Sequence, residues 1–241
     1  MQGQRLLEWY THMGADELIG EVPINRTIAH ARPPIESPII LPPKLSLGEI
    51  NNLGDLRQAL LAFDGCSLRQ GANQLVFADG DPEARIMFVG EAPSAEEDRL
   101  GLPFMGQEGR LLEKMLAAIG LKRENIYLSN IVPWRPPGNR PPNAREVAAL
   151  LPFIERQIEL VDPEILVLLG QTAAQAILAK NESIGRLRGG WHEYATPGLS
   201  RPLAAIATFH PTYLLNTPSR KREVWQDFLQ IKHKLFSQLS H

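Results

Sequence analysis

The stretch Glu164-Ile-Leu-Val-Leu-Leu-Gly170 gives the clearest indication of the fold. Its unbroken apolar run is typical of a strand covered on both faces, because a half-exposed strand would alternate apolar and polar side chains. The residues that follow, 171–180, have a helical pattern. A buried strand followed directly by a helix is the repeating unit of α/β proteins with mainly parallel sheets.

The same alternation of strand and helix continues on both sides of this stretch. We predict further strands over residues 85–90, 126–130 and 203–208, and helices over residues 108–119, 144–160 and 221–236. Residues 186–194 are interpreted as a hairpin. Repeated alternation favours right-handed crossovers between parallel strands. The predicted fold class is therefore α/β: a three-layer α/β/α sandwich with a central, mainly parallel four-stranded sheet.

The first 45 residues differ in pattern from the rest of the chain. Residues 1–19 have the apolar periodicity of a short helix, and residues 22–45 contain six prolines, which we interpret as an extended strap. Residues 47–63 are again helical in pattern. We therefore divide the chain into an N-terminal helix and Pro-rich strap, residues 1–45, and a catalytic domain, residues 46–241.

Composition narrows the class of protein. The chain has 241 residues, a formal net charge of −2 and a single cysteine, which excludes an internal disulfide and any metal site needing three or four thiolates from this chain. No stretch approaches the ~20 consecutive apolar residues of a membrane span. The first residues lack the apolar core of a secretory signal, so we expect a cytoplasmic protein.

Charge is distributed unevenly along the chain. Residues 1–100 hold 15 acidic and 8 basic residues, a net charge of −7, whereas residues 101–241 hold 12 and 17, a net charge of +5. A basic C-terminal part favours an anionic partner, although solvated surface charge alone would give the same pattern.

Polar groups follow each of the four predicted strands. Glu91 begins the segment after the first, Asn130 ends the second, Gln171 follows the third, and His210 follows the fourth. In an open parallel sheet, the carboxyl ends of the strands are where ligands bind. We find no Ser–His–acid order and no metal-ligand spacing, so a polar site without a nucleophilic triad or a metal is predicted.

The same segments resemble the motifs of the family 4-type uracil-DNA glycosylases. The matching stretches are Val89-Gly-Glu-Ala-Pro-Ser-Ala-Glu-Glu-Asp98, Gly101-Leu-Pro-Phe-Met-Gly106, Gly109-Arg-Leu-Leu112, Asn130 with Arg135-Pro-Pro-Gly-Asn-Arg140, Leu169-Gly170 with Ala173, and His210-Pro-Thr-Tyr-Leu-Leu215. They occur in the family's order between about residues 60 and 235. The resemblance implies a monofunctional DNA repair enzyme that flips uracil out of DNA and hydrolyses its N-glycosidic bond.

The resemblance also implies a role for each matching residue. Phe104 would stack on the extruded uracil, Asn130 would read its O4/N3 edge, and His210 would contact O2 and stabilise the leaving anion. The implied catalytic residues are Glu91, Glu97 and His210, and the implied uracil-binding residues are Ala92, Ser94, Phe104, Asn130 and His210. The DNA-binding candidates are Arg135, Arg140, Gly170, Gln171, Leu214, Arg220 and Lys221, with Arg222 as a further one; the basic residues among them are chosen because phosphate contacts need positive charge. The resemblance implies that Leu214 is the wedge that fills the vacated stack.

The sequence departs from the family pattern at several positions. The family holds a [4Fe–4S] cluster on four cysteines, and the corresponding positions here are Phe63, Cys66, Trp134 and Leu150. We therefore expect no cofactor and no metal, with apolar packing in place of the cluster. Ser94 replaces a glycine, which leaves rejection of thymine open. Residues 134–145 lack the histidine of a crosslinking branch, so covalent trapping is not expected.

Each assignment has a structural alternative, and the function has competitors. Phe104 could be core packing, and Asn130 and His210 could be structural hydrogen-bonding groups. Leu214 and Leu215 could both be buried, and the acidic run 96–98 and basic run 220–222 could be solvated surface. The expected partner is DNA that contains uracil or other deaminated bases, bound by a monomer with no membrane contact. The alternatives are a broader-specificity glycosylase that removes xanthine or hypoxanthine, a non-catalytic lesion-binding protein, and an unrelated nucleotide-binding protein, which the absence of G-x-G-x-x-G and of a Walker lysine disfavours.

Overall fold

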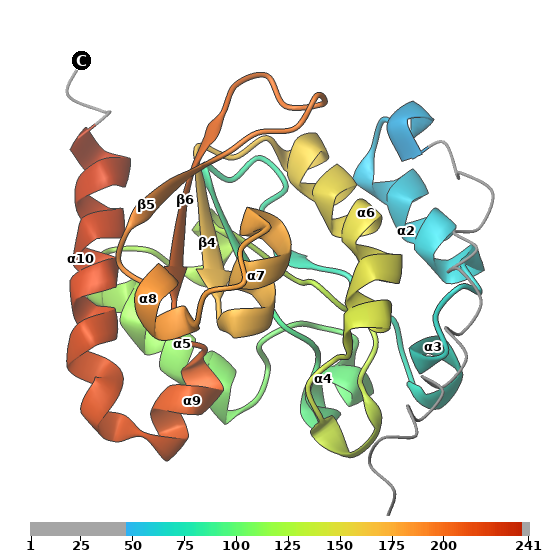
Figure 1. Ribbon diagram of the computed structural model, residues 1–241, viewed down its shortest axis with the longest axis horizontal. Coiled ribbons are helices and arrows are strands. Elements are labelled where there is room, and N and C mark those ends of the chain that lie inside the picture. Colours follow the sequence, from blue (N-terminus) through green and yellow to red (C-terminus); the bar gives the residue numbers. More distant parts are fainter. Residues whose placement is uncertain (1–46, 238–241) are drawn as a thin grey trace, which may run out of the picture. The chain divides into compact units, whose positions relative to one another are not determined.

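A computed structural model of the protein describes residues 47–237. Its centre is a six-stranded sheet with the order β1-β3-β2-β4-β6-β5. Figure 1 labels β4, β5 and β6 of this sheet. The four inner strands, β3, β2, β4 and β6, are parallel, and the edge strands β1 and β5 are antiparallel to their neighbours. The strands are β1 (Asp79–Gly80), β2 (Ile86–Gly90), β3 (Tyr127–Asn130), β4 (Ile165–Leu169), β5 (Trp191–Tyr194) and β6 (Leu203–Thr208).

The predicted four-stranded parallel sheet is confirmed, and the structure adds two edge strands to it. β5 comes from the second half of the predicted hairpin, whose first half instead forms the short helix α8 (Ile184–Leu187). β1 has only two residues, Asp79 and Gly80, and no apolar pattern from which to predict it.

Helices cover both faces of the sheet. The helices are α2 (Leu53–Ala62), α3 (Leu68–Gly71), α4 (Ala95–Leu100), α5 (Gln107–Ala118), α6 (Ala144–Val161), α7 (Gln171–Leu178), α8, α9 (Pro211–Asn216) and α10 (Lys221–Ser237), with 3-10 turns at Leu47–Glu49, Arg123–Asn125, Pro137–Asn139 and Pro218–Arg220. The helices predicted over 108–119, 144–160, 171–180 and 221–236 begin and end within about two residues of α5, α6, α7 and α10. The helix predicted over 47–63 is shorter than expected: Asn52 caps α2, so the helix starts at Leu53, and residues 47–49 form a separate 3-10 turn. The three-layer arrangement is therefore the predicted one (Figure 1).

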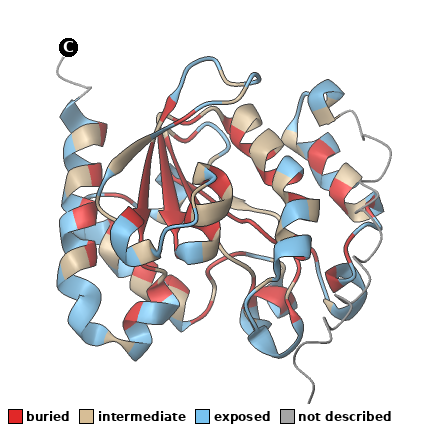
Figure 2. Ribbon diagram, viewed as in Figure 1, coloured by how far each residue is buried: buried red, intermediate tan, exposed pale blue. Residues whose placement is uncertain are grey.

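Two apolar clusters, one on each face of the sheet, form the core. Met87 and Val89 of β2 pack with α2, α6 and α7, whereas Ile86 and Phe88 of the same strand pack with α5, α9 and α10. Successive side chains of a strand point to opposite faces, so a strand between two layers must be apolar throughout. All five residues of β4 are buried, as the unbroken run at 165–169 predicts (Figure 2).

The parallel register brings the strand ends together at one edge of the sheet. Gly90 at the end of β2 lies opposite Asn130 at the end of β3, and Leu169 lies opposite Thr208 at the end of β6. The segments that follow these strands therefore start side by side, which is the predicted location of the site.

Two predictions concern other parts of the chain. The helix and Pro-rich strap predicted for residues 1–45 lie outside the described residues. Among residues 47–237, no helix is both long and apolar enough to cross a lipid bilayer.

Candidate active site

Gly90, Phe104 and Asn130 meet at the end of β2. A Cβ atom added at Gly90 would overlap Oδ1 of Asn130 and would lie 2.6 Å from Cζ of the Phe104 ring. Both side chains therefore lie directly over the Gly90 backbone. The absence of a side chain at Gly90 is what allows an aromatic face and an amide to share this position. We refer to Gly90, Phe104, Asn130 and the adjacent His210 as the strand-end site.

Phe104 is held in an unusual backbone conformation. Its φ is +56°, a value that residues other than glycine adopt rarely, and its side chain is only 1% exposed. The Glu97 carboxylate accepts a hydrogen bond from its N–H, and Nη1 of Arg123 donates to its carbonyl oxygen over 3.1 Å. Gly109 must lack a side chain, because a Cβ there would collide with the same carbonyl. Such strain persists where the surroundings enforce it, which is typical of functional sites.

Asn130 has a buried polar atom without a partner. Its side chain is 4% exposed, and Nδ2 forms no hydrogen bond within the described residues. A buried donor that is left unpaired costs about 1–3 kcal/mol, so it is rare in folded proteins. The Asn130 amide therefore has a donor that no described residue uses.

The His210 ring lies next to the Phe104 ring. Their ring centroids are 5.9 Å apart and their planes are inclined by 28°. His210 is the N-cap of α9, and its Nδ1 accepts the N–H of Thr212 over 3.2 Å. The neutral imidazole therefore carries its proton on Nε2. Burial lowers the pKa of His210, while the charges of Glu91 and Glu108 act in the opposite direction. At neutral pH the site thus presents an uncharged N–H donor.

Two carboxylates predicted to be catalytic have different surroundings. Oε1 of Glu91 accepts the N–H of Thr172, 2.8 Å away, at the start of α7, and its other oxygen has no hydrogen-bond partner among the described residues. Gly170 makes this contact possible, because a Cβ there would lie 2.6 Å from Oε1. Glu97 is 3% exposed, and both of its carboxylate oxygens accept hydrogen bonds. One accepts the N–H of Phe104, and the other accepts the N–H of Ser94, 2.6 Å away.

Burial raises the pKa of Glu97, although these backbone hydrogen bonds oppose the shift. The geometry of Glu97 suits a group that fixes the Ser94–Phe104 segment better than one that touches a substrate. The structure adds Glu108, which the sequence analysis missed: it accepts the hydroxyl of Ser94 over 2.9 Å. Its position in the first turn of α5, two residues after Gly106, was the available signal. Ala92, also predicted at the site, is half-buried and packs against the apolar cluster to which α6 contributes.

The basic residues predicted to bind DNA differ in whether they already form ion pairs or hydrogen bonds within the protein. Arg140 forms an ion pair with Glu146 at 2.5 Å, and Arg220 forms one with Glu223 at 2.6 Å. Arg135 donates from Nε to the side chain of Asn139, 2.6 Å away. Lys221 and Arg222 are exposed at the start of α10 and form no ion pair with other described residues. Gln171 is exposed at the start of α7.

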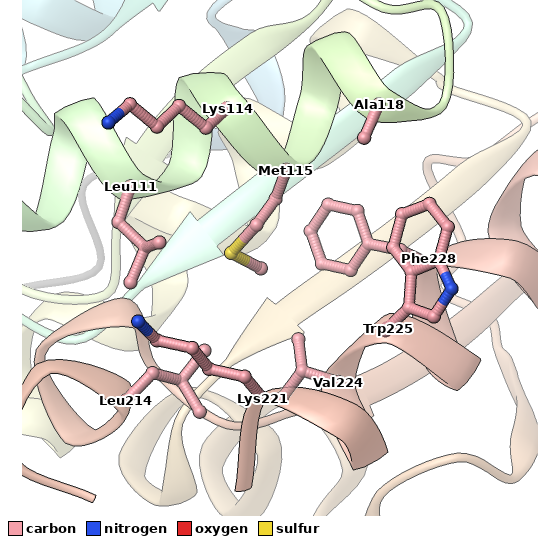
Figure 3. A pocket seen from close by; sticks show the side chains of 9 residues that line it. All are labelled: Leu111, Lys114, Met115, Ala118, Leu214, Lys221, Val224, Trp225 and Phe228. Carbon is pink, nitrogen blue, oxygen red and sulfur yellow. The ribbon is translucent and has the colours of Figure 1, made fainter. Parts of the chain in front are cut away.

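Leu214 does not occupy the position that a wedge requires. It is 0% exposed, and it lines a cavity of about 260 Å³ between α5, α9 and α10, with the amino groups of Lys114 and Lys221 nearby (Figure 3). A residue that enters a base stack must reach the surface. The exposed large side chains of α9 are its neighbours, Tyr213 at 42% and Leu215 at 38%. The assignment to Leu214 is therefore corrected: the turn of α9 directs Leu214 into the core.

The four positions that correspond to cluster cysteines do not fit an iron–sulfur cluster. Phe63, Cys66, Trp134 and Leu150 are all at most 5% exposed and belong to one apolar cluster, in which Phe63 packs on Phe153 with ring centroids 5.0 Å apart. Only Cys66 offers a ligand atom, and burial raises the pKa of its thiol. Within residues 47–237, no group of three or more His, Cys, Asp or Glu residues could hold a metal ion.

Comparison with known proteins gives a consistent family. A family model described as the uracil DNA glycosylase superfamily matches residues 77–229. The chain is 36% identical over 186 residues to a type-4 uracil-DNA glycosylase of Archaeoglobus fulgidus, which covers 76% of this chain and 92% of that protein. It is 39% identical over 170 residues to a type-4 uracil-DNA glycosylase of Thermotoga maritima, covering 69% and 86%. A type-5 uracil-DNA glycosylase of Thermus thermophilus is 33% identical over 144 residues, covering 52% and 65%.

Proposed function

The chain belongs to the uracil DNA glycosylase superfamily, and we propose that it excises uracil from DNA at the strand-end site and leaves an abasic site. The observation that carries the proposal is the buried, unpartnered Nδ2 of Asn130, whose side chain meets that of Phe104 over Gly90, with the His210 ring centroid 5.9 Å from that of Phe104. A flat ligand with polar groups along its edges would satisfy all three residues, and a pyrimidine base has this chemistry.

The base must leave the DNA stack before its glycosidic bond can be reached, at a cost of a few kcal/mol. Stacking on the Phe104 face would offset about 1–3 kcal/mol of this cost. We assign the wedge that replaces the base to Leu215, because it is exposed on α9 soon after His210, whereas the exposed Tyr213 stacks on Phe209 with ring centroids 4.9 Å apart. This part of the proposal replaces Leu214.

Selectivity for uracil would rest on Asn130. A side-chain amide offers one donor and one acceptor, which match O4 and N3–H of uracil. Cytosine has the opposite pattern, an acceptor at N3 and a donor at the exocyclic amine. Cytosine in the same pose would therefore leave buried polar groups unpaired, at about 1–3 kcal/mol each.

In the chemical step the bond between C1′ of the deoxyribose and N1 of uracil breaks, and its electron pair stays with the base. Negative charge then spreads to O2, where the Nε2–H of His210 would stabilise it. Positive charge develops on the sugar. The free oxygen of Glu91 would stabilise that charge and accept a proton from the water that adds to C1′. Glu97 would position the Ser94–Phe104 segment, and no step requires a metal or cluster.

DNA binding would follow from the basic C-terminal part of the chain. We assign phosphate contacts first to Lys221 and Arg222, whose charges are unpaired among the described residues, and then to Arg135 and Gln171. Arg140 and Arg220 would contribute less, because carboxylates already hold them. We further propose that the enzyme acts as a monomer and is cytoplasmic; the single cysteine supports the second part, because it leaves no internal disulfide.

The proposal is tested with end-labelled oligonucleotides that each carry one uracil, thymine, hypoxanthine or xanthine, as single strands and as duplexes. We expect strand scission at uracil after alkali treatment and none without it, because a monofunctional enzyme leaves the abasic strand intact. Scission at hypoxanthine or xanthine as well would extend the activity to other deaminated bases. Tight binding of the uracil strand without product would overturn the proposal in favour of a lesion-binding protein.

A further inference from the structure

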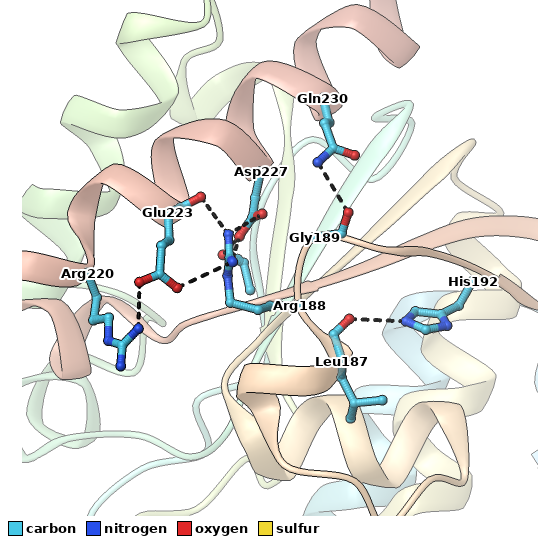
Figure 4. Close-up of polar contacts among 9 residues, drawn as sticks. Leu187, Arg188, Gly189, His192, Arg220, Glu223, Asp227 and Gln230 are labelled. Atoms are coloured by element: carbon cyan, nitrogen blue, oxygen red, sulfur yellow. Dashed lines mark hydrogen bonds and ion pairs between the residues drawn. The ribbon is translucent and has the colours of Figure 1, made fainter.

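A buried ion pair between Arg188 and Asp227 lies next to the end of β6, the strand that precedes His210; Figure 4 shows the pair and its polar contacts. Nη2 of Arg188 lies 2.6 Å from Oδ1 of Asp227, and Nε lies 3.2 Å from Oδ2. The Asp227 side chain is 1% exposed and that of Arg188 is 14% exposed. Arg188 directly follows α8, and Asp227 belongs to α10, so the pair joins two elements that flank β6.

The same pair contacts the last residues of β6. The hydroxyl of Thr208 donates to Oδ2 of Asp227 over 2.6 Å. The guanidinium of Arg188 lies over the Phe209 ring, 5.6 Å from its centroid. The next residue, Gly189, donates its N–H to the carbonyl of Ala207 over 3.1 Å. Three consecutive residues, 207–209, are therefore held immediately before His210.

On its outer side the pair is tied to the start of α10. Nη2 of Arg188 donates to the carbonyl of Glu223 over 2.6 Å, and Glu223 in turn pairs with Arg220. Gly189 also fits here for a steric reason: its φ is +72°, and a Cβ would lie 2.9 Å from Asp227. The backbone at Gly189 therefore leaves room for the Asp227 carboxylate, and the backbone at Glu223 binds its partner Arg188.

A buried ion pair is a poor source of stability, because desolvation of the two charges offsets much of their attraction. Burial raises the pKa of Asp227, while the hydrogen bond from Thr208 and the charge of Arg188 oppose the shift. An apolar pair could fill the same space. An apolar pair could not, however, form the hydrogen bonds to Thr208 and Glu223 or the cation–π contact with Phe209.

We propose that Arg188 and Asp227 are positioning residues for His210: their contacts with Thr208 and Phe209 hold the end of β6 so that the imidazole faces Phe104. The inference rests on the proposed function, since it assigns these residues a part in uracil excision. Neither residue touches the strand-end site itself. Their effect on the reaction therefore passes through His210.

The test is a double-mutant cycle on the single-turnover rate of uracil excision, using Arg188→Lys, Asp227→Asn, His210→Ala and the combinations. Lysine keeps the charge but cannot reproduce the two-point contact with Asp227. We expect each positioning variant to lower the rate by about 10- to 100-fold with little change in DNA affinity, because a small misplacement of a reacting group has effects of this size. In the His210→Ala background the same substitutions should change the rate by less than about twofold, because the group they position is gone.

A matched control is Arg85→Lys. Arg85 forms an equally close ion pair with Glu164, at 2.7 Å, but beside the opposite ends of β2 and β4. We expect this variant to excise uracil at the wild-type rate. Thermal unfolding of every variant shows which rates come from folded protein.

An unchanged rate in both folded positioning variants overturns the inference, and so does an equal fold-loss with and without His210. Failure of the wild-type protein to excise uracil would instead overturn the proposed function, so the two failures are distinguishable.

Discussion

Replacing Asn130 with leucine should lower activity without lowering stability. The two side chains have similar size and both branch at Cγ, so leucine fits the space with little change. The substitution removes Nδ2, which is buried and unpartnered, and so removes a desolvation cost of about 1–3 kcal/mol. Part of this gain in stability is lost, because the leucine side chain must repack against Gly90 and Phe104. We expect a melting temperature equal to that of the wild type or up to about 5 °C higher, since 1 kcal/mol corresponds to about 2–4 °C at this size.

The expected effect on the reaction has the opposite sign. Leucine offers neither a donor nor an acceptor to the base edge, and loss of such a contact in a water-excluded site costs about 10²–10³-fold in rate. The assay is single-turnover excision from a single-uracil oligonucleotide, read as alkali-labile strands on a denaturing gel. Thermal unfolding is measured on the same preparation.

The matched control is Asn52→Ala. Asn52 is an exposed N-cap, whose side chain accepts the N–H of Asp55 over 2.8 Å. Its loss should cost about 1 kcal/mol of stability and leave excision unchanged. The reasoning about Asn130 would be refuted if the leucine variant excised uracil within threefold of the wild-type rate. It would also be refuted by a clear fall in melting temperature, because the amide would then have a structural partner.

Three further predictions concern the same account. Gly90→Ala should reduce excision at least 10²-fold and lower the free energy of unfolding by about 1–3 kcal/mol, because the new methyl group overlaps Asn130 and Phe104. The control Gly185→Ala should change neither quantity, because a methyl group there points into open space. The rate constant of excision should stay level from pH 8 down to 6.5, because burial lowers the pKa of His210 and its neutral form already carries the Nε2–H; an inflection above pH 6.5 that disappears in His210→Ala would contradict this. Arg222→Ala should weaken binding to any DNA and reduce the slope of log K against log salt by about 0.9, whereas Arg140→Ala, which breaks the pair with Glu146, should lower the melting temperature and leave that slope unchanged.

Most of the fold could be predicted because its layers impose clear patterns. A strand between two helical layers must be apolar throughout, which made 165–169 recognisable, and the helices that cover it repeat their apolar residues on one face. The edge strands could not be predicted in the same way. Two residues at 79–80 carry no periodicity. Residues 191–194 of β5 fall within the predicted hairpin, but they pair with the next strand, β6.

The sequence predicts the residues that lie at strand ends better than it predicts which residues of a helix face the site. Gly90 and Asn130 are adjacent because parallel strands end together. Leu214 and Leu215 show the limit, since one residue of rotation on α9 separates a core side chain from a surface one, and both are leucine. Glu97 and Glu108 show another: a carboxylate in the first turn of a helix can bind a backbone N–H, a hydroxyl or a substrate, and only the three-dimensional path of residues 94–108 distinguishes these roles.

The central claim is that this chain, which has one cysteine, releases uracil by hydrolysis. The most direct measurement is mass spectrometry of the free base after the purified protein is incubated with uracil-containing DNA, with abasic sites counted in the same sample. The account predicts free uracil and abasic sites in a one-to-one ratio, and their joint loss in Asn130→Leu. Tight binding of the DNA with no uracil released by folded wild-type protein would contradict it.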